Sequence, residues 1–256
     1  MNGISAKKVL QMEGRSEAKG PARRWRPIIG VLMALLMAVV VVPAAAEEES
    51  GTERAEMTAD DYAERVQHFY GKTEDFQASF LQTYTDIAAG EAKQSRGRVY
   101  FKKPGMMRWD YYRRDANQRD RILVSDGNTF YIYEFEYQQV FRECLEDSQL
   151  PTALRFLMGD GELLDEFDVE LSEESTPQRP VLELTPKRPT AEYTKLVFVL
   201  DPESYQVSKT TLHDPYGNTN QIDFRQSRVN SGLPDEGFEF ETPAGARELN
   251  PEKRCD

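Results

Sequence analysis

RVYFKKPGMMRWDYY, residues Arg98–Tyr112, is the stretch that decides the fold. It predicts two β-strands joined by a turn at Lys103–Met106, because Pro104 fixes φ and Gly105 accepts a positive φ. On both sides of the turn, apolar and polar side chains alternate with a period of two residues, which is typical of half-buried antiparallel strands. One face is rich in Met, Trp and other aromatic side chains. That face either fills an ordinary sheet core or lines a space for an apolar guest.

The two-residue period recurs along most of the chain. We expect strands at 76–84, 95–102, 106–112, 121–125, 129–134, 138–142, 168–171, 181–184, 195–200, 206–213 and 220–226. Short turns separate most of these segments and no helical crossover lies between the first six, which favours an antiparallel meander. A twisted sheet of about 11 strands tends to curl. The expected fold class is therefore mainly β with short α, an incomplete antiparallel β-barrel.

Two or three short amphipathic helices interrupt this pattern, the third being a short helical turn at Glu162–Phe167. The first is expected to begin at the N-cap Thr58 and to end at Gly71. The second is expected near residues 148–158, where Leu154 belongs to an apolar stripe. Since each helix has a single apolar stripe, we expect them to cover the open mouth of the sheet as a helical lid.

The N-terminus has the organisation of a secretory signal peptide. Residues 1–46 combine a basic beginning, the 15-residue apolar run Ile28–Val42 and small residues before Glu47. An uncleaved anchor is the alternative, although spanning a membrane takes about 20 apolar residues. Residues 47–57 are expected to be a disordered acidic lead-in. Residues 58–256 are expected to form a single domain.

The charge of the chain limits its partners. The chain carries a net charge of −12, and residues 1–46 contain seven Lys or Arg and two Glu, so the remaining 210 residues carry −17. This excess of negative charge argues against nucleic acid and against anionic membrane surfaces as partners. Export to an oxidising space would allow a disulfide between Cys144 and Cys255, and two unrelated thiols are the alternative.

The sequence contains no recognisable catalytic constellation. Its two histidines, His68 and His213, have no nucleophile at a known spacing, and the sequence has no G-x-S-x-G, H-E-x-x-H, C-x-x-C or P-loop motif. The acidic clusters lack the ligand spacing of a calcium site, so we expect no metal and no cofactor. Binding is therefore favoured over catalysis. An esterase that uses Ser125 or His213 is the enzymatic alternative.

Four phrases of the sequence resemble the LolA family, the periplasmic carriers of outer-membrane lipoproteins. They are DFQASFxQ at 75–82, GRVYFKKPGMMRW at 97–109, ILVSDG at 122–127 and FEFxxP at 238–243. The resemblance covers Phe76 to about Pro243 and implies an incomplete barrel with a helical lid over an apolar cavity. It implies a non-catalytic chaperone that takes acylated lipoproteins from an inner-membrane lipoprotein-releasing ABC transporter to an outer-membrane lipoprotein receptor. We expect it to act as a monomer in the periplasm.

The resemblance also implies where cargo binds. The face with Met107, Trp109 and Tyr111 is expected to turn inward. The acyl-chain cavity is expected to involve Phe76, Phe80, Val99, Phe101, Met107, Trp109 and Leu154.

Lid control is the other role that the resemblance suggests. It assigns this role to Lys103, where well-studied members have an Arg that holds the lid by hydrogen bonds. Because Lys has no bidentate fork, the lid would be latched differently, with Arg108 as a substitute to consider. Two alternative functions stay open: a carrier of a glycolipid or another acylated product, and a lipid-sensing envelope regulator.

Overall fold

The computed structural model describes residues 57–113, 118–145, 162–249 and 255, which all belong to one compact unit, Glu53–Asp256. Its strands are β1 (Asp75–Asp86), β2 (Glu91–Lys102), β3 (Met106–Tyr112), β4 (Arg119–Asp126), β5 (Thr129–Glu134), β6 (Gln139–Cys144), β7 (Phe167–Leu171), β8 (Val181–Pro186), β9 (Lys195–Leu200), β10 (Val207–His213), β11 (Thr219–Val229) and β12 (Arg247–Leu249). The helices are α1 (Ala59–Gly71), α3 (Leu163–Glu166) and the 3₁₀ turn η2 (Asp235–Phe238).

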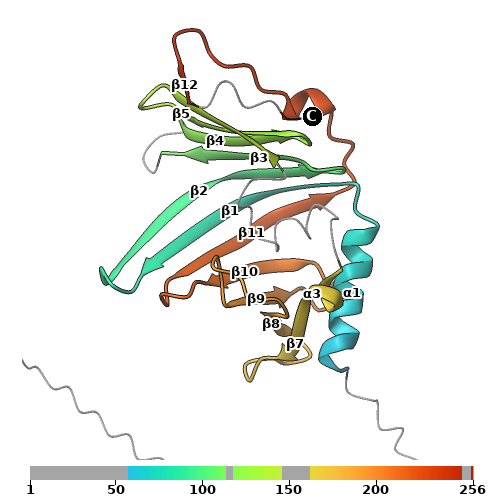
Figure 1. Cartoon of the computed structure of the whole chain (residues 1–256). Helices are drawn as coiled ribbons and strands as arrows, with labels where there is room; N and C mark the ends of the chain where they lie inside the picture. Colours follow the sequence, from blue (N-terminus) through green and yellow to red (C-terminus); the bar gives the residue numbers. More distant parts are fainter. Residues whose placement is uncertain (1–56, 114–117, 146–161, 250–254, 256) are drawn as a thin grey trace, which may run out of the picture. The chain divides into compact units, whose positions relative to one another are not determined.

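All twelve strands form one sheet, in the order β12-β6-β5-β4-β3-β2-β1-β11-β10-β9-β8-β7 (Figure 1). The strands make two antiparallel meanders, β1–β6 and β7–β11, which meet where β1 pairs with β11. The edge strands β12 and β7 do not pair with each other, so the sheet is open. The prediction of an incomplete, mainly antiparallel β-fold is confirmed.

The strand count needs one correction. The sequence predicted about 11 strands and none after residue 226, but Arg247–Leu249 form β12, which pairs in parallel with Gln139–Phe141 of β6. An edge strand such as β6 has unpaired backbone groups, and these can bind an extended segment of almost any sequence. Side-chain alternation therefore could not reveal β12.

Helix α1 begins as the sequence predicts. The Thr58 hydroxyl accepts a hydrogen bond from the Asp61 N–H at 3.2 Å, and the Asp61 carboxylate accepts one from the Thr58 N–H at 2.8 Å, which is a capping box. Tyr62, Val66 and Tyr70 form its buried stripe. The second predicted helix, at 148–158, lies outside the described residues. Among those that are described, no helix is long and apolar enough to cross a membrane.

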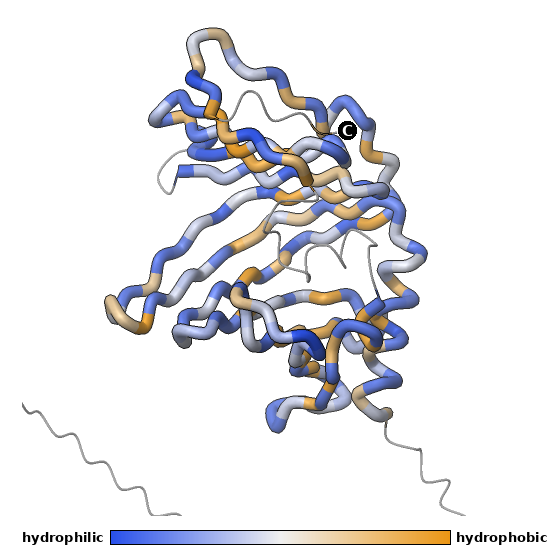
Figure 2. Tube along the Cα trace, in the orientation of Figure 1, coloured by the Kyte–Doolittle hydropathy of each residue, from blue (hydrophilic) through white to orange (hydrophobic). Residues whose placement is uncertain are grey.

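Side chains from both faces of the sheet are buried. Figure 2 shows hydrophobic residues distributed along the strands and α1. We call the face with Met107, Trp109 and Tyr111 the inner face, and the opposite one the outer face. The inner face belongs to the large apolar cluster, which also includes buried side chains of α1. The chain's C-terminal part packs on the outer face, where the Phe240 ring lies 5.2 Å from that of Tyr131.

Cys255, the last described residue, is bonded covalently to the sheet. The structure contains a disulfide between Cys144, at the end of β6, and Cys255, with their Cα atoms 5.2 Å apart. The two cysteines are 111 residues apart in sequence. The segment that follows β11 is therefore attached covalently at its far end.

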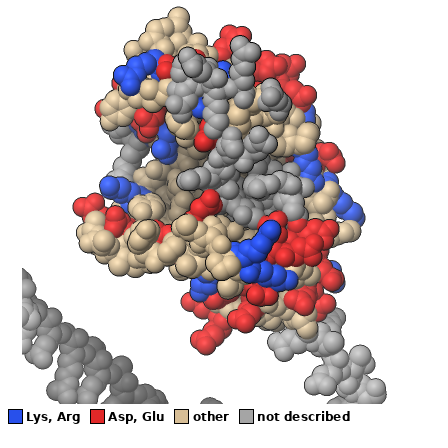
Figure 3. Space-filling view, viewed as in Figure 1, with Lys and Arg blue, Asp and Glu red and all other residues tan. Residues whose placement is uncertain are grey.

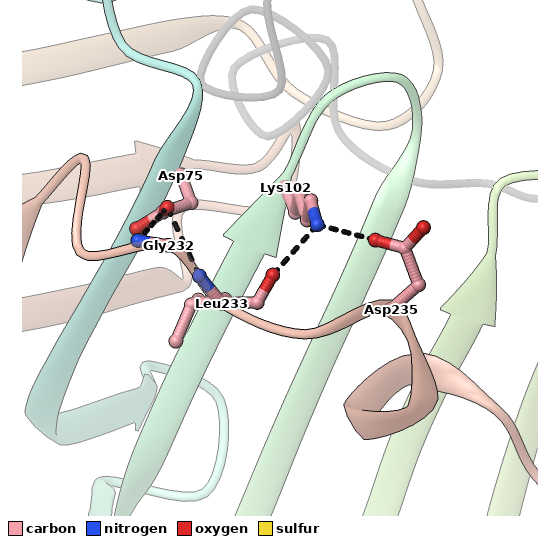
Figure 4. A network of polar contacts seen from close by, with 5 residues as sticks. All are labelled: Asp75, Lys102, Gly232, Leu233 and Asp235. Atoms are coloured by element: carbon pink, nitrogen blue, oxygen red, sulfur yellow. Dashed lines mark hydrogen bonds and ion pairs between the residues drawn. The ribbon is translucent and has the colours of Figure 1, made fainter.

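A buried carboxylate holds the beginning of that segment. The Asp75 oxygens accept hydrogen bonds from the Ser231 N–H at 2.8 Å, the Ser231 hydroxyl at 2.9 Å, the Gly232 N–H at 2.7 Å and the Leu233 N–H at 3.2 Å (Figure 4). Lys102 donates to the Leu233 carbonyl at 2.6 Å and pairs with Asp235. Together these contacts attach the chain after β11 to the adjoining ends of β1 and β2.

Asp75 is more acidic than an ordinary aspartate. Burial by itself would raise the pKa of this carboxyl, but the hydrogen bonds from Ser231, Leu233 and Gly232 outweigh burial and lower the pKa below its usual value. A lowered pKa in the folded state stabilises the protein above the unfolded-state pKa of about 3.9. This stabilisation is lost as the pH falls through the lower folded-state pKa.

We predict that Asp75→Asn lowers the free energy of unfolding by about 2–3 kcal/mol at pH 7, because three backbone N–H donors and the Ser231 hydroxyl lose their anionic acceptor. Urea unfolding across pH 2–7 measures this, and the difference from the wild type should shrink below about pH 4. Glu74→Gln, at the exposed neighbouring position, is the matched control. A difference that persists unchanged at acidic pH would contradict the role of the Asp75 charge.

Candidate functional site

Strand register builds the centre of the inner face. In β1, β2 and β3, three rows of side chains lie across the strands: Phe76 with Phe101 and Met107, Ala78 with Val99 and Trp109, and Phe80 with Gly97 and Tyr111. Two of the three rows contain a small residue. The large rings of neighbouring rows can therefore lean into the space beside it.

The aromatic side chains of these rows contact one another. The centre of the Phe80 ring lies 4.9 Å from the centre of the Trp109 ring and 5.0 Å from that of the Tyr111 ring, in edge-to-face arrangements. Phe101 adds an edge-to-face contact with Trp109 at 5.7 Å. Such pairs contribute about 0.5–1.5 kcal/mol each beyond the apolar area that they bury. The centre of the inner face is thus a connected aromatic cluster.

Gly97 makes this packing possible. A Cβ atom at Gly97 would lie 2.6 Å from the Phe80 ring and 2.1 Å from the backbone carbonyl oxygen of Asp110. Real Cβ atoms do not approach this closely, and the backbone oxygen is held by the β2–β3 pairing. The absence of a side chain at Gly97 is therefore required by the close approach, without any unusual backbone angle.

Six of the seven residues predicted to line the cavity lie in the same buried cluster: Phe76, Phe80, Val99, Phe101, Met107 and Trp109. Each has at most 3% of its surface exposed. Leu154 lies outside the described residues. Whether these side chains bind acyl chains stays a prediction.

The second meander, β7–β11, contributes as many buried strand residues to the apolar cluster as the first meander does. This contribution was not predicted. Its buried members are Phe167, Leu182, Leu184, Leu196, Phe198, Leu200, Val207, Ile222 and Phe224. The continuous apolar run Leu196–Leu200 was the available signal in the sequence. The Phe76 ring connects the two halves, because it lies 5.7 Å from the Phe224 ring and 6.0 Å from the Phe101 ring. Figure 3 shows a hollow on the viewed side, between the two halves of the sheet.

Lys103 binds the end of α1. Its Nζ donates hydrogen bonds to the carbonyl oxygens of Tyr70 at 2.8 Å and Gly71 at 3.1 Å. These are terminal carbonyls of the helix, which lack partners within it and carry its negative dipole end. The Lys103 side chain thus connects the β2–β3 turn to α1. In that turn, Gly105 has the expected positive φ of 65°. Control of a lid by Lys103 remains a prediction.

Arg108 does not share this role. Its Nε donates to Asp110 at 3.0 Å, and its guanidinium donates to the Gly237 carbonyl at 3.1 Å on the outer face. Because Arg108 and Met107 point to opposite faces of β3, Arg108 cannot substitute for Lys103 at the end of α1.

Two buried tyrosines provide polar groups near the inner face. The Tyr70 hydroxyl accepts a hydrogen bond from the Val207 N–H at 3.2 Å and so connects α1 to β10. Burial raises the pKa of Tyr70 and of Tyr111 above the ordinary value, so both stay neutral at physiological pH. The Arg121 guanidinium lies 4.5 Å from the centre of the Tyr111 ring. No cluster of His, Cys, Asp and Glu suited to a metal was found among the residues that the structure describes.

Sequence comparison gives this geometry a family context. Residues 71–241 match the family described as "Outer membrane lipoprotein carrier protein LolA". The chain belongs to the LolA family. The matched range includes β1 to β11 and therefore every described residue of the predicted cavity. The resemblance inferred from the four sequence phrases is confirmed at the level of the family.

Individual relatives are distant. The chain is 26% identical over 182 residues to an outer-membrane lipoprotein carrier protein of Methylococcus capsulatus, a match that covers 71% of this chain and 84% of the relative. A protein of the same name from Cupriavidus pinatubonensis is 29% identical over 155 residues, a match that covers 59% of this chain and 68% of that relative. A LolA superfamily structure from Nitrosomonas europaea has 13% identity and a TM-score of 0.41, and it covers 72% of this chain and 99% of that one. Membership in the LolA family rests on the sequence match.

We predict that Gly97→Ala lowers the free energy of unfolding by about 2–3 kcal/mol, because Phe80 must leave its position against the strand. Chemical denaturation with near-UV circular dichroism measures both stability and aromatic packing. Gly71→Ala, where a Cβ meets nothing within 4 Å, serves as the control. Equal stabilities of the two variants would show that the close approach at Gly97 is not needed.

We predict that Lys103→Leu destabilises the C-terminal turn of α1 by about 1–2 kcal/mol, because two helix carbonyls lose their charged donor. Amide hydrogen exchange at Phe69–Lys72 should become faster, and Lys103→Arg should restore much of the protection. Lys93→Leu, on the exposed part of the preceding strand β2, is the control. If exchange and the rates of lipopeptide loading and release are unchanged in Lys103→Leu, lid control by this residue is excluded.

Proposed function

We propose that this LolA-family protein is a periplasmic chaperone that shields the acyl chains of lipoproteins released from the inner membrane and carries them to the outer membrane. The observation that supports this most directly is the continuous apolar cluster that extends across both halves of an open sheet. The names of the relatives from Methylococcus and Cupriavidus agree with it.

The energetics of acyl chains fit such a site. Burial of each CH₂ group is worth about 0.8 kcal/mol, so a chain of about 16 carbons does not leave a membrane for water unaided. The inner face offers aliphatic, aromatic and Met side chains, and Met107 in particular has a flexible, polarizable thioether. A wall of this kind can adapt to acyl chains of different lengths without a specific polar contact.

The side chains at the centre of the inner face are covered by other parts of the protein. Phe76, Phe80 and Trp109 are each only 3% exposed, so cargo must displace whatever covers them. Helix α1 is one element that packs against this cluster, through Tyr62 and Val66. We propose that loading moves a covering element away from the sheet, while the β1–β11 pairing stays intact.

The proposal carries expectations about partners. The donor would be an inner-membrane lipoprotein-releasing ABC transporter and the acceptor an outer-membrane lipoprotein receptor. The protein would not chemically change its cargo, since it only transfers acyl chains between apolar surroundings. The predicted signal peptide at 1–46 supports a periplasmic location.

Trp109 provides a direct test. The sequence has two tryptophans, Trp25 and Trp109, and Trp25 lies in the predicted signal peptide, so the mature chain from Glu47 has Trp109 as its single reporter. We predict that a triacylated lipopeptide with brominated acyl chains quenches Trp109 fluorescence, because bromine must approach the indole to quench it. The same peptide without acyl chains should have no effect.

A second reporter shows which face of the sheet is occupied. In the mature chain with Trp109→Phe, Leu81→Trp places the single indole on the outer face, since Leu81 is adjacent to the inward Phe80 on β1. This reporter should not be quenched. Quenching at Leu81→Trp with none at Trp109, in folded proteins, would refute binding at the inner face.

A further inference from the structure

The outer face contains a group of arginines that lack carboxylate partners. Arg96 and Arg98 of β2 and Arg225 of β11 are all exposed. Among the described residues, none of these three forms an ion pair. This is unusual for a chain with a net charge of −12. An acidic protein has many carboxylates available to pair with surface arginines, yet among the described residues none forms an ion pair with Arg96, Arg98 or Arg225.

Strand register explains how these arginines come together. Ser79 of β1 is paired with Arg225 on one side and with Arg98 on the other, and Leu81 is paired with Arg96. The three guanidinium groups therefore surround the central part of β1 on the outer face. The hydroxyl of Tyr100 is a hydrogen-bond partner of Arg98.

The carboxylate opposite Arg98 is already occupied. Asp110 is paired with Arg98 in the β2–β3 register, but its two oxygens accept hydrogen bonds from Arg108 at 3.0 Å and Arg119 at 3.3 Å. Asp223, opposite Leu81, pairs with Lys209 at 3.2 Å. The local acidic groups are thus neutralised by other cations, and the three arginines keep their charge available.

The surface between these arginines is hollowed. Arg225, Arg98 and Arg96 line a hollow of about 560 Å³ together with Ser79 and Tyr112. A second hollow of about 430 Å³ shares Arg96 and Tyr112 with the first and also includes Arg113. A third, of about 630 Å³, continues from Tyr112 and Arg113 to Arg119. We call this series of hollows the arginine groove.

Charge varies along the arginine groove. Asp120 is the one carboxylate among the described residues that line it, and it lies 3.9 Å from Arg113. Arg113 also lies 4.0 Å from Glu136, so the Arg113 end is partly neutralised. The end formed by Arg225, Arg98 and Arg96 carries the uncompensated positive charge.

We propose that the arginine groove is a docking site for an extended, Asp- and Glu-rich segment of a partner protein. Planar guanidinium groups match carboxylates with two parallel hydrogen bonds, and such pairs are stronger than those of lysine. The groove has room for several consecutive residues, and Tyr112 and Leu81 offer apolar contact between the charges. Charge complementarity selects an acidic segment over a basic or neutral one.

The acidic surface around the arginine groove disfavours an anionic membrane as the occupant. A membrane presents negative charge over an area much larger than the groove and would face the acidic remainder of the protein as well. At physiological ionic strength, charges within about 8 Å of each other still interact. Carboxylates on the protein surface around the groove would therefore repel the lipid headgroups that lie next to them. A single acidic segment contacts the arginines alone.

The arginine groove lies on the opposite face of β1 and β2 from the apolar inner face. A partner bound in it would not compete with cargo for the same side chains. The inference therefore stands apart from the proposed carrier function, and either can fail without the other.

The test uses the full chain and a fluorophore-labelled peptide of twelve alternating Asp and Glu residues. Fluorescence anisotropy measures its affinity at 50 mM and 150 mM salt for three proteins: the wild type, the double variant Arg98→Gln with Arg225→Gln, and the control Arg188→Gln with Arg247→Gln. The control removes the same two charges at exposed positions away from the groove. Quenching of Trp109 by the brominated lipopeptide is measured in parallel, with near-UV circular dichroism.

We expect the wild type and the control to bind the peptide and the Arg98/Arg225 variant to bind it at least about fivefold more weakly, with a smaller dependence on salt, as expected for two lost ion pairs. Circular dichroism should be unchanged. Absence of peptide binding by the wild type would overturn the proposal. A decrease in affinity of less than about fivefold in the Arg98/Arg225 variant, or an equal decrease in the control variant, would also overturn it. Binding of phosphatidylglycerol vesicles, but not of the peptide, through the same arginines would replace it with a membrane site.

Discussion

The pairing of β1 with β11 is the interaction on which the rest of the structure depends. Each meander is built from neighbours in sequence, but this pairing joins residues such as Phe80 and Phe224 that are far apart along the chain. It brings the apolar rows of both halves onto one face, where Phe76 contacts Phe101 on one side and Phe224 on the other. Without it, each half would expose its inner face to water.

The sequence predicted what is local and missed what is not. The period of two residues, the Pro104–Gly105 turn and the Thr58 cap depend on neighbouring residues, so the strands of β2 and β3 and helix α1 were correctly predicted. Alternation also predicted that Met107 and Trp109 share a buried face. It cannot say which strand pairs with which, and therefore the contribution of β7–β11 to the cluster was missed. The family resemblance suggested that Lys103 holds the helical lid, but the neighbouring residues did not indicate that its acceptors would be the last carbonyls of α1.

The two faces of β1 differ in a way that suits different contacts. Phe76, Ala78 and Phe80 point into the apolar cluster, while Ser79 and Leu81 lie between arginines on the outer face. The chain after β11 is kept at one end of this outer face by Asp75 and Lys102, and at its far end by the Cys144–Cys255 disulfide. Among the described residues, the C-terminal segment packs on the outer face near Tyr131.

The burial of Phe80 and Trp109 has a consequence for the proposed carrier. If Phe80 and Trp109 were exposed to water without cargo, the protein would gain the full burial energy of each acyl chain on loading and would release it with difficulty. Because these rings already contact each other at 4.9 Å, acyl chains must replace existing contacts, and only the difference in free energy favours binding. A packed but deformable face therefore lets one protein both accept cargo and release it. On this view, substitutions that loosen the aromatic cluster should strengthen retention of cargo even as they weaken the fold.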